Sequence, residues 1–161
     1  MRRLLWIALA ALVVGTPALA AAEGRPFGLG LILGSPTGIS AKAYIAKGHA
    51  IDAALGVAFV NGNGFHIHAD YLWHPLILAH DEAFTLPLYI GIGGRMLFRG
   101  RDDKQGDKLH LGPRAPVGIL FDFKTVPIDV FLEVALVIDV IRTEGDDVVD
   151  INAGVGVRYY F

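Results

Sequence analysis

Four side chains that could ligate a metal ion follow one another closely in the sequence: His66, His68, Asp70 and His74. Residues two apart on a strand point to the same face, so a strand here would place all four on one side. Imidazole and carboxylate groups are zinc ligands. Neighbours on one strand face nevertheless lie about 7 Å apart, too far for all four to share one ion. We therefore expect no metal and no cofactor, and we assign these side chains to a polar network.

The sequence offers little for covalent catalysis. It has no cysteine, which also excludes disulfides and thiolate metal sites. Ser35 has no histidine close in sequence, Ser40 belongs to the polar face of a predicted strand, and no G-x-S-x-G motif is present. The glycine-rich stretch 91–94 lies within a predicted strand and not before a helix, which argues against a dinucleotide-binding loop. We predict that the protein is not an enzyme, with a lipid-modifying enzyme as a less favoured alternative.

Alternation of apolar and polar residues runs through most of the chain and predicts strands. Between Ile128 and Ile138 every even position is aliphatic, and the odd positions include Asp129 and Glu133. Seven other segments alternate in the same way, and turn residues separate them, with a longer link predicted from Pro75 to Thr85. The predicted strands cover residues 27–34, 39–45, 51–59, 65–74, 86–99, 109–123, 128–138 and 150–161.

The composition of the two faces indicates which one points outward. The polar face consists mainly of glycine, alanine and sparse charges of both signs, whereas a water-exposed face would carry many Lys and Glu residues. The apolar faces contain no charge and place aromatic residues near strand ends, as the lipid face of a membrane barrel requires. The even strand number and the strand length also match a bilayer span. We predict an all-β fold, an eight-stranded antiparallel up-and-down transmembrane β-barrel, with a soluble periplasmic barrel as the alternative.

Such a barrel would enclose the charged residues of the polar face. Enclosed charges must be paired and hydrogen-bonded, because a lone buried charge is very costly. An eight-stranded barrel has an interior only wide enough for side chains. We therefore predict a lumen filled by a charge network of Lys42, Asp52, His66, His68, Asp70, Arg95, Arg114, Asp122, Asp129, Glu133 and Arg158.

The N-terminal segment resembles an export signal. Met1-Arg2-Arg3 precedes an apolar run from Leu4 to Val14 and then small residues up to Ala22. This is the layout of a secretory signal, and the apolar run is short for a spanning helix. We expect residues 1–20 to be a signal peptide, cleaved after Ala20 or Ala22, and residues 23–161 to form an outer-membrane β-barrel. The net charge of -2 implies no strong electrostatic attraction to nucleic acid.

The last strand carries a possible assembly signal. The sequence stops at Phe161, with apolar residues at alternate positions before it and a glycine upstream. This pattern resembles the terminal signal by which the barrel assembly machinery of outer membranes recognises its substrates. The predicted signal residues are Gly154, Val157, Tyr159 and Phe161.

With these features the chain resembles the small outer-membrane barrels of the OmpA, OmpX and OmpW type, and more closely a family of uncharacterised bacterial outer-membrane β-barrel proteins. Residues 34–42, 50–56, 66–74, 86–95 and 127–134 carry the resemblance. It implies Sec-type export and a location in the bacterial outer membrane. It implies no activity and no catalytic residues.

The expected role is structural or surface-interacting, with outer-membrane lipid, lipopolysaccharide and the assembly machinery as partners, no nucleic acid, and a monomeric state. A narrow channel for small or apolar solutes is the alternative. With the N-terminus in the periplasm, the outward loops would be short, which argues against a large adhesive surface. These loops would be Gly34–Gly38, Val60–Gly64, Arg99–Lys108 and Arg142–Val149.

Overall fold

The computed structural model describes residues 24–59, 64–100, 108–142 and 145–161. The signal peptide predicted for residues 1–20 lies outside these ranges, as does most of the predicted loops Val60–Gly64 and Arg99–Lys108. In the described part, no helix is long and apolar enough to cross a membrane. The described residues form eight strands: β1 (Phe27–Gly34), β2 (Thr37–Ala46), β3 (His49–Ala58), β4 (Gly64–His80), β5 (Phe84–Arg99), β6 (Lys108–Phe123), β7 (Ile128–Ile138) and β8 (Val149–Tyr160).

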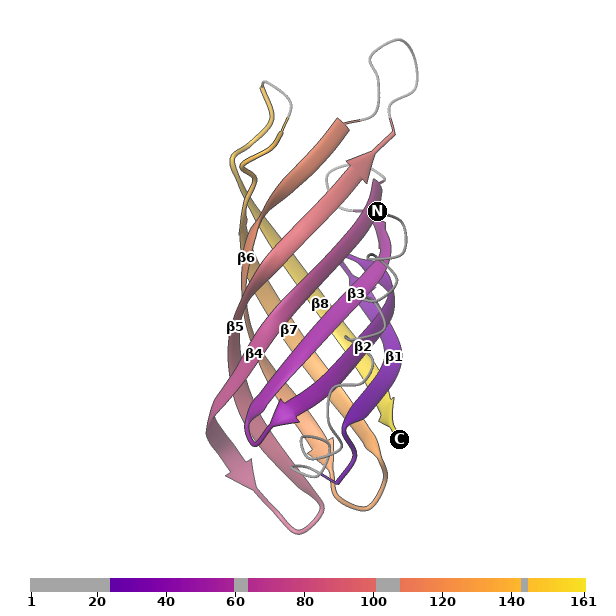
Figure 1. Ribbon diagram of the computed structural model, residues 1–161. Helices are drawn as coiled ribbons and strands as arrows, with labels where there is room; N and C mark the ends of the chain where they lie inside the picture. Colours follow the sequence, from indigo (N-terminus) through magenta and orange to yellow (C-terminus); the bar gives the residue numbers. More distant parts are fainter. Residues whose placement is uncertain (1–23, 60–63, 101–107, 143–144) are drawn as a thin grey trace, which may run out of the picture.

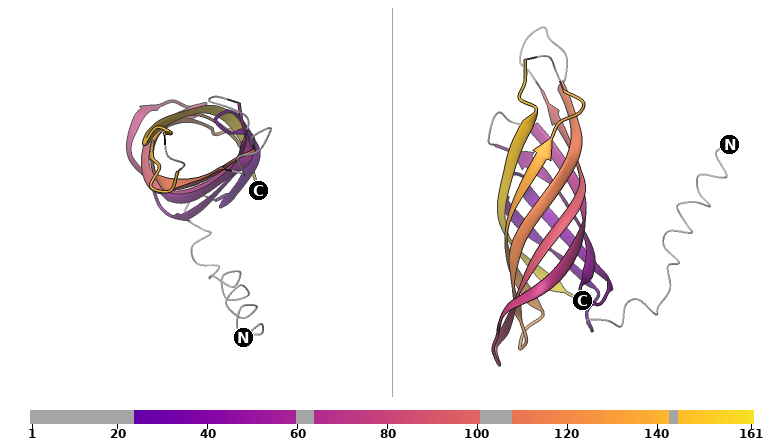
Figure 2. Two further views of the ribbon diagram at one scale, coloured as in Figure 1. Left: turned by 90° about the horizontal axis from the view of Figure 1, so that it is seen from above. Right: turned by 90° about the vertical axis from the view of Figure 1, so that its left-hand side faces the viewer.

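Every strand pairs antiparallel with its neighbours in sequence, and β1 also pairs with β8, so the sheet closes into a barrel (Figure 1). The predicted eight-stranded antiparallel fold is confirmed. The view along the axis shows the closed ring (Figure 2). Closure gives each strand a partner on both sides, which removes the free edges that an open sheet exposes.

The two faces of the sheet lie as the alternation predicts. Along β8 exposed and buried residues alternate almost without interruption, with Ile151, Val155 and Val157 outside and Asn152 and Arg158 inside. A soluble barrel with an apolar core would show the opposite arrangement. The outside of this barrel is apolar, and its inside holds the buried charges together with a cluster of buried apolar side chains.

Glycines on the inner face make room for aromatic rings. Tyr89 lies opposite Gly118, and Tyr160 lies opposite Gly28. A Cβ at Gly28 would lie 2.7 Å from Cζ of Tyr160, closer than real Cβ contacts. The same relation holds between Phe131 and Gly156. Each of these three rings therefore lies over a residue that lacks a side chain.

The link predicted from Pro75 to Thr85 is wrong. β4 continues to His80 and β5 begins at Phe84, so the turn between them is short. The register of β4 shifts twice, between Trp73 and Leu76 and again between Ile77 and Ala79. Each shift changes which residues face outward, so this part of β4 shows no regular alternation of apolar and polar residues in the sequence. Pro75 lies within the first irregularity, where a residue without an N–H is tolerated.

The two ends of the barrel differ. At one end, here called the terminal end, the chain enters β1 and leaves β8, and Phe161 N donates to Phe27 O at 2.9 Å. The β4–β5 hairpin projects beyond the other strands at this end (Figure 1), since β3 stops pairing with β4 at Trp73. The opposite end, here called the loop end, carries the segment that joins β7 to β8 (Figure 2).

Candidate functional site

The polar lumen is the candidate site, and its side chains form three tiers along the barrel. In the tier nearest the terminal end, Arg158 on β8 and Asp129 on β7 are cross-strand partners. Arg158 Nε lies 3.3 Å from Asp129 Oδ1. Asp129 also accepts a 2.6 Å hydrogen bond from the Tyr160 hydroxyl. Arg158 Nη1 lies 3.7 Å from Asp52 Oδ2. The guanidinium carbon of Arg158 also lies over the Phe131 ring, 3.9 Å from its centroid. One arginine thus joins β3, β7 and β8 across the lumen.

Lys42 in the same tier is bonded to neutral groups. Its Nζ lies 3.1 Å from the Tyr44 hydroxyl and 2.9 Å from His74 Nε2. His74 Nδ1 lies 3.1 Å from the Gly48 carbonyl, which can only accept, so this nitrogen carries the proton. Nε2 of His74 is therefore the acceptor for Lys42. The lysine also lies 4.5 Å from the centroid of the Tyr44 ring, a favourable position for a cation.

The middle tier is centred on Arg114. Its guanidinium pairs with Asp70 on β4 and with Glu133 on β7, and all three side chains are buried. Glu133 also accepts a 2.9 Å hydrogen bond from the Tyr89 hydroxyl. His68 extends the tier, with Nε2 3.9 Å from Asp70 Oδ2. These contacts join side chains of β4, β5, β6 and β7 inside the barrel.

The middle tier also brings together donors for a metal ion. Ligand atoms of His68, Asp70 and Glu133 lie within 4.8 Å of one another. Arg114 already supplies a positive charge to both carboxylates, so a divalent ion would have to displace it. His74, the last member of the predicted run, lies with Lys42 in the tier below. The donor set therefore fits an arginine better than a metal.

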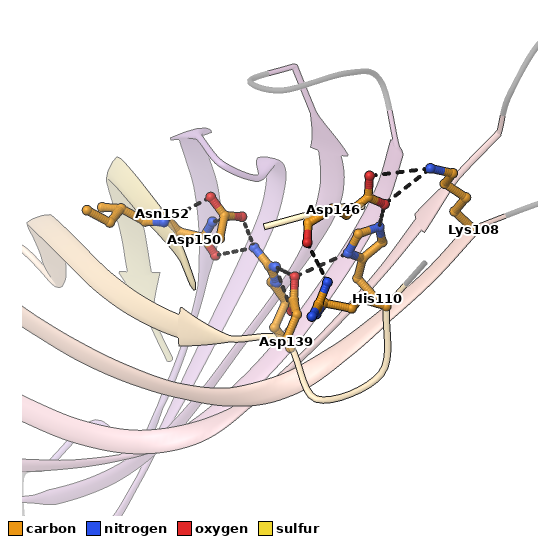
Figure 3. A network of polar contacts seen from close by, with 9 residues as sticks. Lys108, His110, Asp139, Asp146, Asp150 and Asn152 are labelled. Carbon is orange, nitrogen blue, oxygen red and sulfur yellow. Dashed lines mark hydrogen bonds and ion pairs between the residues drawn. The ribbon is translucent and has the colours of Figure 1, made fainter. Parts of the chain in front are cut away.

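The third tier lies near the loop end (Figure 3). Arg95 donates to both oxygens of Asp139 at 2.6 and 2.8 Å and also pairs with Asp150. His110 lies between Asp139, at 3.2 Å from Nδ1, and Asp146, at 3.3 Å from Nε2. This tier links the barrel wall to the segment between β7 and β8.

The structure buries most of the predicted network residues inside the barrel. Asp122 differs, because it is half-buried and lines the mouth at the terminal end. Two cavities of about 450 and 390 Å³ open there and share Tyr44 and Asp122. The predicted residues that are buried are Lys42, Asp52, His66, His68, Asp70, Arg95, Arg114, Asp129, Glu133 and Arg158.

The predicted network omitted several residues that join it in the structure. Tyr89, Tyr160, His110 and Asn152 lie on the predicted polar face, so the alternation already indicated their direction. Asp139 follows the last residue of β7 and continues the odd-numbered polar face of the predicted strand. Its contact with Arg95 shows which partner it meets in the lumen.

The fold and its interior together define a class: a closed eight-stranded antiparallel barrel with an apolar exterior and buried pairs of charges inside. No known family model matches the sequence, and no curated protein matches it either. The structure is similar to the crystal structure of the N-terminal β-barrel domain of Pseudomonas aeruginosa OprF, with a TM-score of 0.60 and 13% sequence identity. The match covers 85% of this chain and 98% of that one. At this identity the likeness shows the fold.

Proposed function

We propose that this protein is a small bacterial outer-membrane barrel with a closed lumen and a structural or surface-interaction role. The apolar exterior supports a membrane location, because a charge on a lipid-facing strand costs about 2–4 kcal/mol at mid-bilayer. The lipid-facing residues of all eight strands carry none. Residues 1–20 act as the signal for Sec-type export.

The contacts of Arg114 in the middle tier are the observation that supports the closed-lumen part of the proposal. Arg114 bridges β4 and β7 across the interior, and Tyr89 and His68 fill the space around it. Water or a solute would have to separate buried ion pairs to pass. Removing one partner of such a pair costs about 3–5 kcal/mol. The lumen therefore serves as packing for the wall, and we propose no catalysis.

Fractionation of cells that produce the full chain tests the location. We expect the protein in the outer-membrane fraction, and we expect unheated samples to migrate differently from heated ones on detergent gels, as a closed barrel does. Recovery in the aqueous fraction without detergent would contradict the membrane proposal.

A narrow channel is the second candidate, because cavities open at both ends of the barrel. The terminal end has the two cavities at Tyr44 and Asp122, and the loop end has one of about 400 Å³. The Arg114 tier lies between them. Refolded protein in planar bilayers should give no steady single-channel steps, and steady steps would replace the closed-lumen proposal by the channel.

A further inference from the structure

His110 on β6 has a carboxylate on each side of its ring. Nδ1 lies 3.2 Å from Asp139 Oδ2, and Nε2 lies 3.3 Å from Asp146 Oδ2. The second contact is within ion-pair distance but lacks the geometry of a hydrogen bond. A neutral imidazole has one N–H, so it can donate to one carboxylate only and turns its lone pair toward the other. A doubly protonated ring can donate to both.

The two carboxylates belong to different parts of the molecule. Asp139 follows β7 directly and is fixed by Arg95, whose side chain is buried in the wall. Asp146 lies in the segment between β7 and β8, where Lys108 contacts its carboxylate at 3.2 Å and Arg142 donates to its carbonyl at 2.5 Å. His110 therefore joins the rim of the barrel to this segment (Figure 3).

The two carboxylates in contact with the His110 ring favour one more proton. The cations that face this cluster are Lys108 on β6, Arg95 and Arg99 on β5, and Arg142, which donates to the Asp146 carbonyl. The carboxylates are those of Asp139, Asp146, Asp147 and Asp150. Within the described residues this makes four positive charges against four negative ones. Asp139 and Asp146 are the groups that contact the two ring nitrogens, so a proton on each nitrogen would face a negative charge.

We propose that His110 is a proton-operated latch that docks the β7–β8 segment on the rim of the barrel. The protonated ring donates to Asp139 and Asp146 together and holds the segment down. The neutral ring keeps one of these bonds, and the segment is then held through Lys108 and Arg142. The latch itself requires only the fold, whereas sensing of the pH outside the cell rests on the proposed outer-membrane orientation.

The carboxylate partner stays ionised over the range in which a histidine titrates. Partial burial raises the pKa of Asp146, but the hydrogen bond and the charge of Lys108 outweigh this and hold that pKa below its usual range. Because the carboxyl pKa is depressed, its contribution is present above about pH 4 and is lost only as the pH falls further. The protonation of His110 therefore sets the latch: it is closed when the ring carries two protons and open when the ring is neutral.

A spin label on the refolded full barrel tests the latch. The chain has no cysteine, so Val148→Cys gives a single labelling site next to the docked segment. Val126→Cys in the β6–β7 turn is the matched control, since the two valines are 45% and 43% exposed. Label mobility is followed from pH 5 to pH 8 with a chelator present. We expect one pH-dependent step in the label mobility at position 148 and none at position 126. As the pH rises through this step, the ratio of docked to released segment should fall on the order of tenfold, which corresponds to the loss of one charge-assisted hydrogen bond.

Two variants identify the group responsible. His110→Gln should remove the step, and Asp146→Asn should remove it as well while altering only a residue outside the barrel wall. Lys108→Gln should raise the label mobility at every pH and leave the step in place. The latch is refuted by a wild-type label that does not change with pH, by a step that survives Asp146→Asn, or by a step that appears only when Zn²⁺ replaces the chelator.

Discussion

Arg114 is the lumen residue whose loss should destabilise the barrel most. Its side chain is 2% exposed and pairs with two buried carboxylates, those of Asp70 and Glu133. Arg114→Met keeps a long apolar stem but leaves both carboxylates without their cation. Breaking one buried pair costs about 3–5 kcal/mol, and because this arginine serves two carboxylates we expect a loss at the upper end, about 5 kcal/mol of unfolding free energy.

A compensated variant separates lost charge pairing from lost packing. Adding Asp70→Asn and Glu133→Gln to Arg114→Met removes the uncompensated charges and retains groups of similar shape. We expect this triple variant to recover most of the stability, because replacing a whole buried ion pair by neutral groups is often nearly neutral. Arg25→Met is the matched control at an exposed position, and it should change the stability by less than about 0.5 kcal/mol.

Denaturant unfolding of the refolded barrel in lipid vesicles measures these differences. Trp73 is the single tryptophan after the predicted signal peptide and lies on the outer face, so its emission reports the transfer from lipid to water. Midpoint and slope together give the free energy of unfolding. The reasoning fails if Arg114→Met costs no more than Arg25→Met, or if the triple variant is no more stable than the single one.

Three further substitutions test the wall, the membrane span and the assembly signal. Gly118→Ala would place a Cβ against the Tyr89 ring and 2.6 Å from Leu132 O, so we expect the free energy of unfolding to fall by about 1–3 kcal/mol. Gly94→Ala is the control, because its Cβ would have its nearest neighbour at 3.9 Å, and it should be tolerated in the same unfolding assay. Leu132→Arg on β7 should lower the free energy of unfolding in vesicles by about 2–4 kcal/mol, and Leu76→Arg on the projecting hairpin by about 0–1 kcal/mol. The two leucines are equally exposed, at 52% and 54%, so they differ only in their position along the barrel. Equal costs would place the hairpin within the bilayer. Phe161→Ala should lower the amount of barrel in the outer membrane of cells while the purified protein still refolds in detergent, and normal amounts in cells would argue against the assembly signal.

The strands and their faces were predictable because apolar outward residues alternate with inward residues that are polar or small. In the proposed membrane barrel each outward side chain must be apolar, so Leu132 and Val134 on β7 indicate the direction of Glu133 between them. The rule fails where a strand leaves the closed wall. Beyond Trp73 the residues of β4 are exposed on both faces and pass through two register shifts, so Leu76, Ile77 and Leu78 follow one another without alternation.

The partners within the lumen could not be predicted from the same pattern. Alternation gives the face of a residue but not its height in the barrel, which depends on strand tilt and on register around the whole ring. Arg114 and Asp70 lie 44 positions apart and meet over Gly93 of β5, which pairs with both residues and places no side chain between them. His68 and His74 share a strand face and nevertheless belong to different tiers.

The three tiers also indicate why a narrow barrel would keep so many charges inside. Arg158 contacts β3 and β7, Arg114 contacts β4 and β7, and Arg95 contacts the end of β7 and β8, so each arginine ties together strands that are not all neighbours. The wall hydrogen bonds join adjacent strands only, and they leave the cross-section free to flatten. Cross-lumen pairs resist flattening, because separating them would leave buried charges without partners. A conducting barrel would have to give up this bracing, which is the physical reason why we favour a rigid membrane protein over a pore.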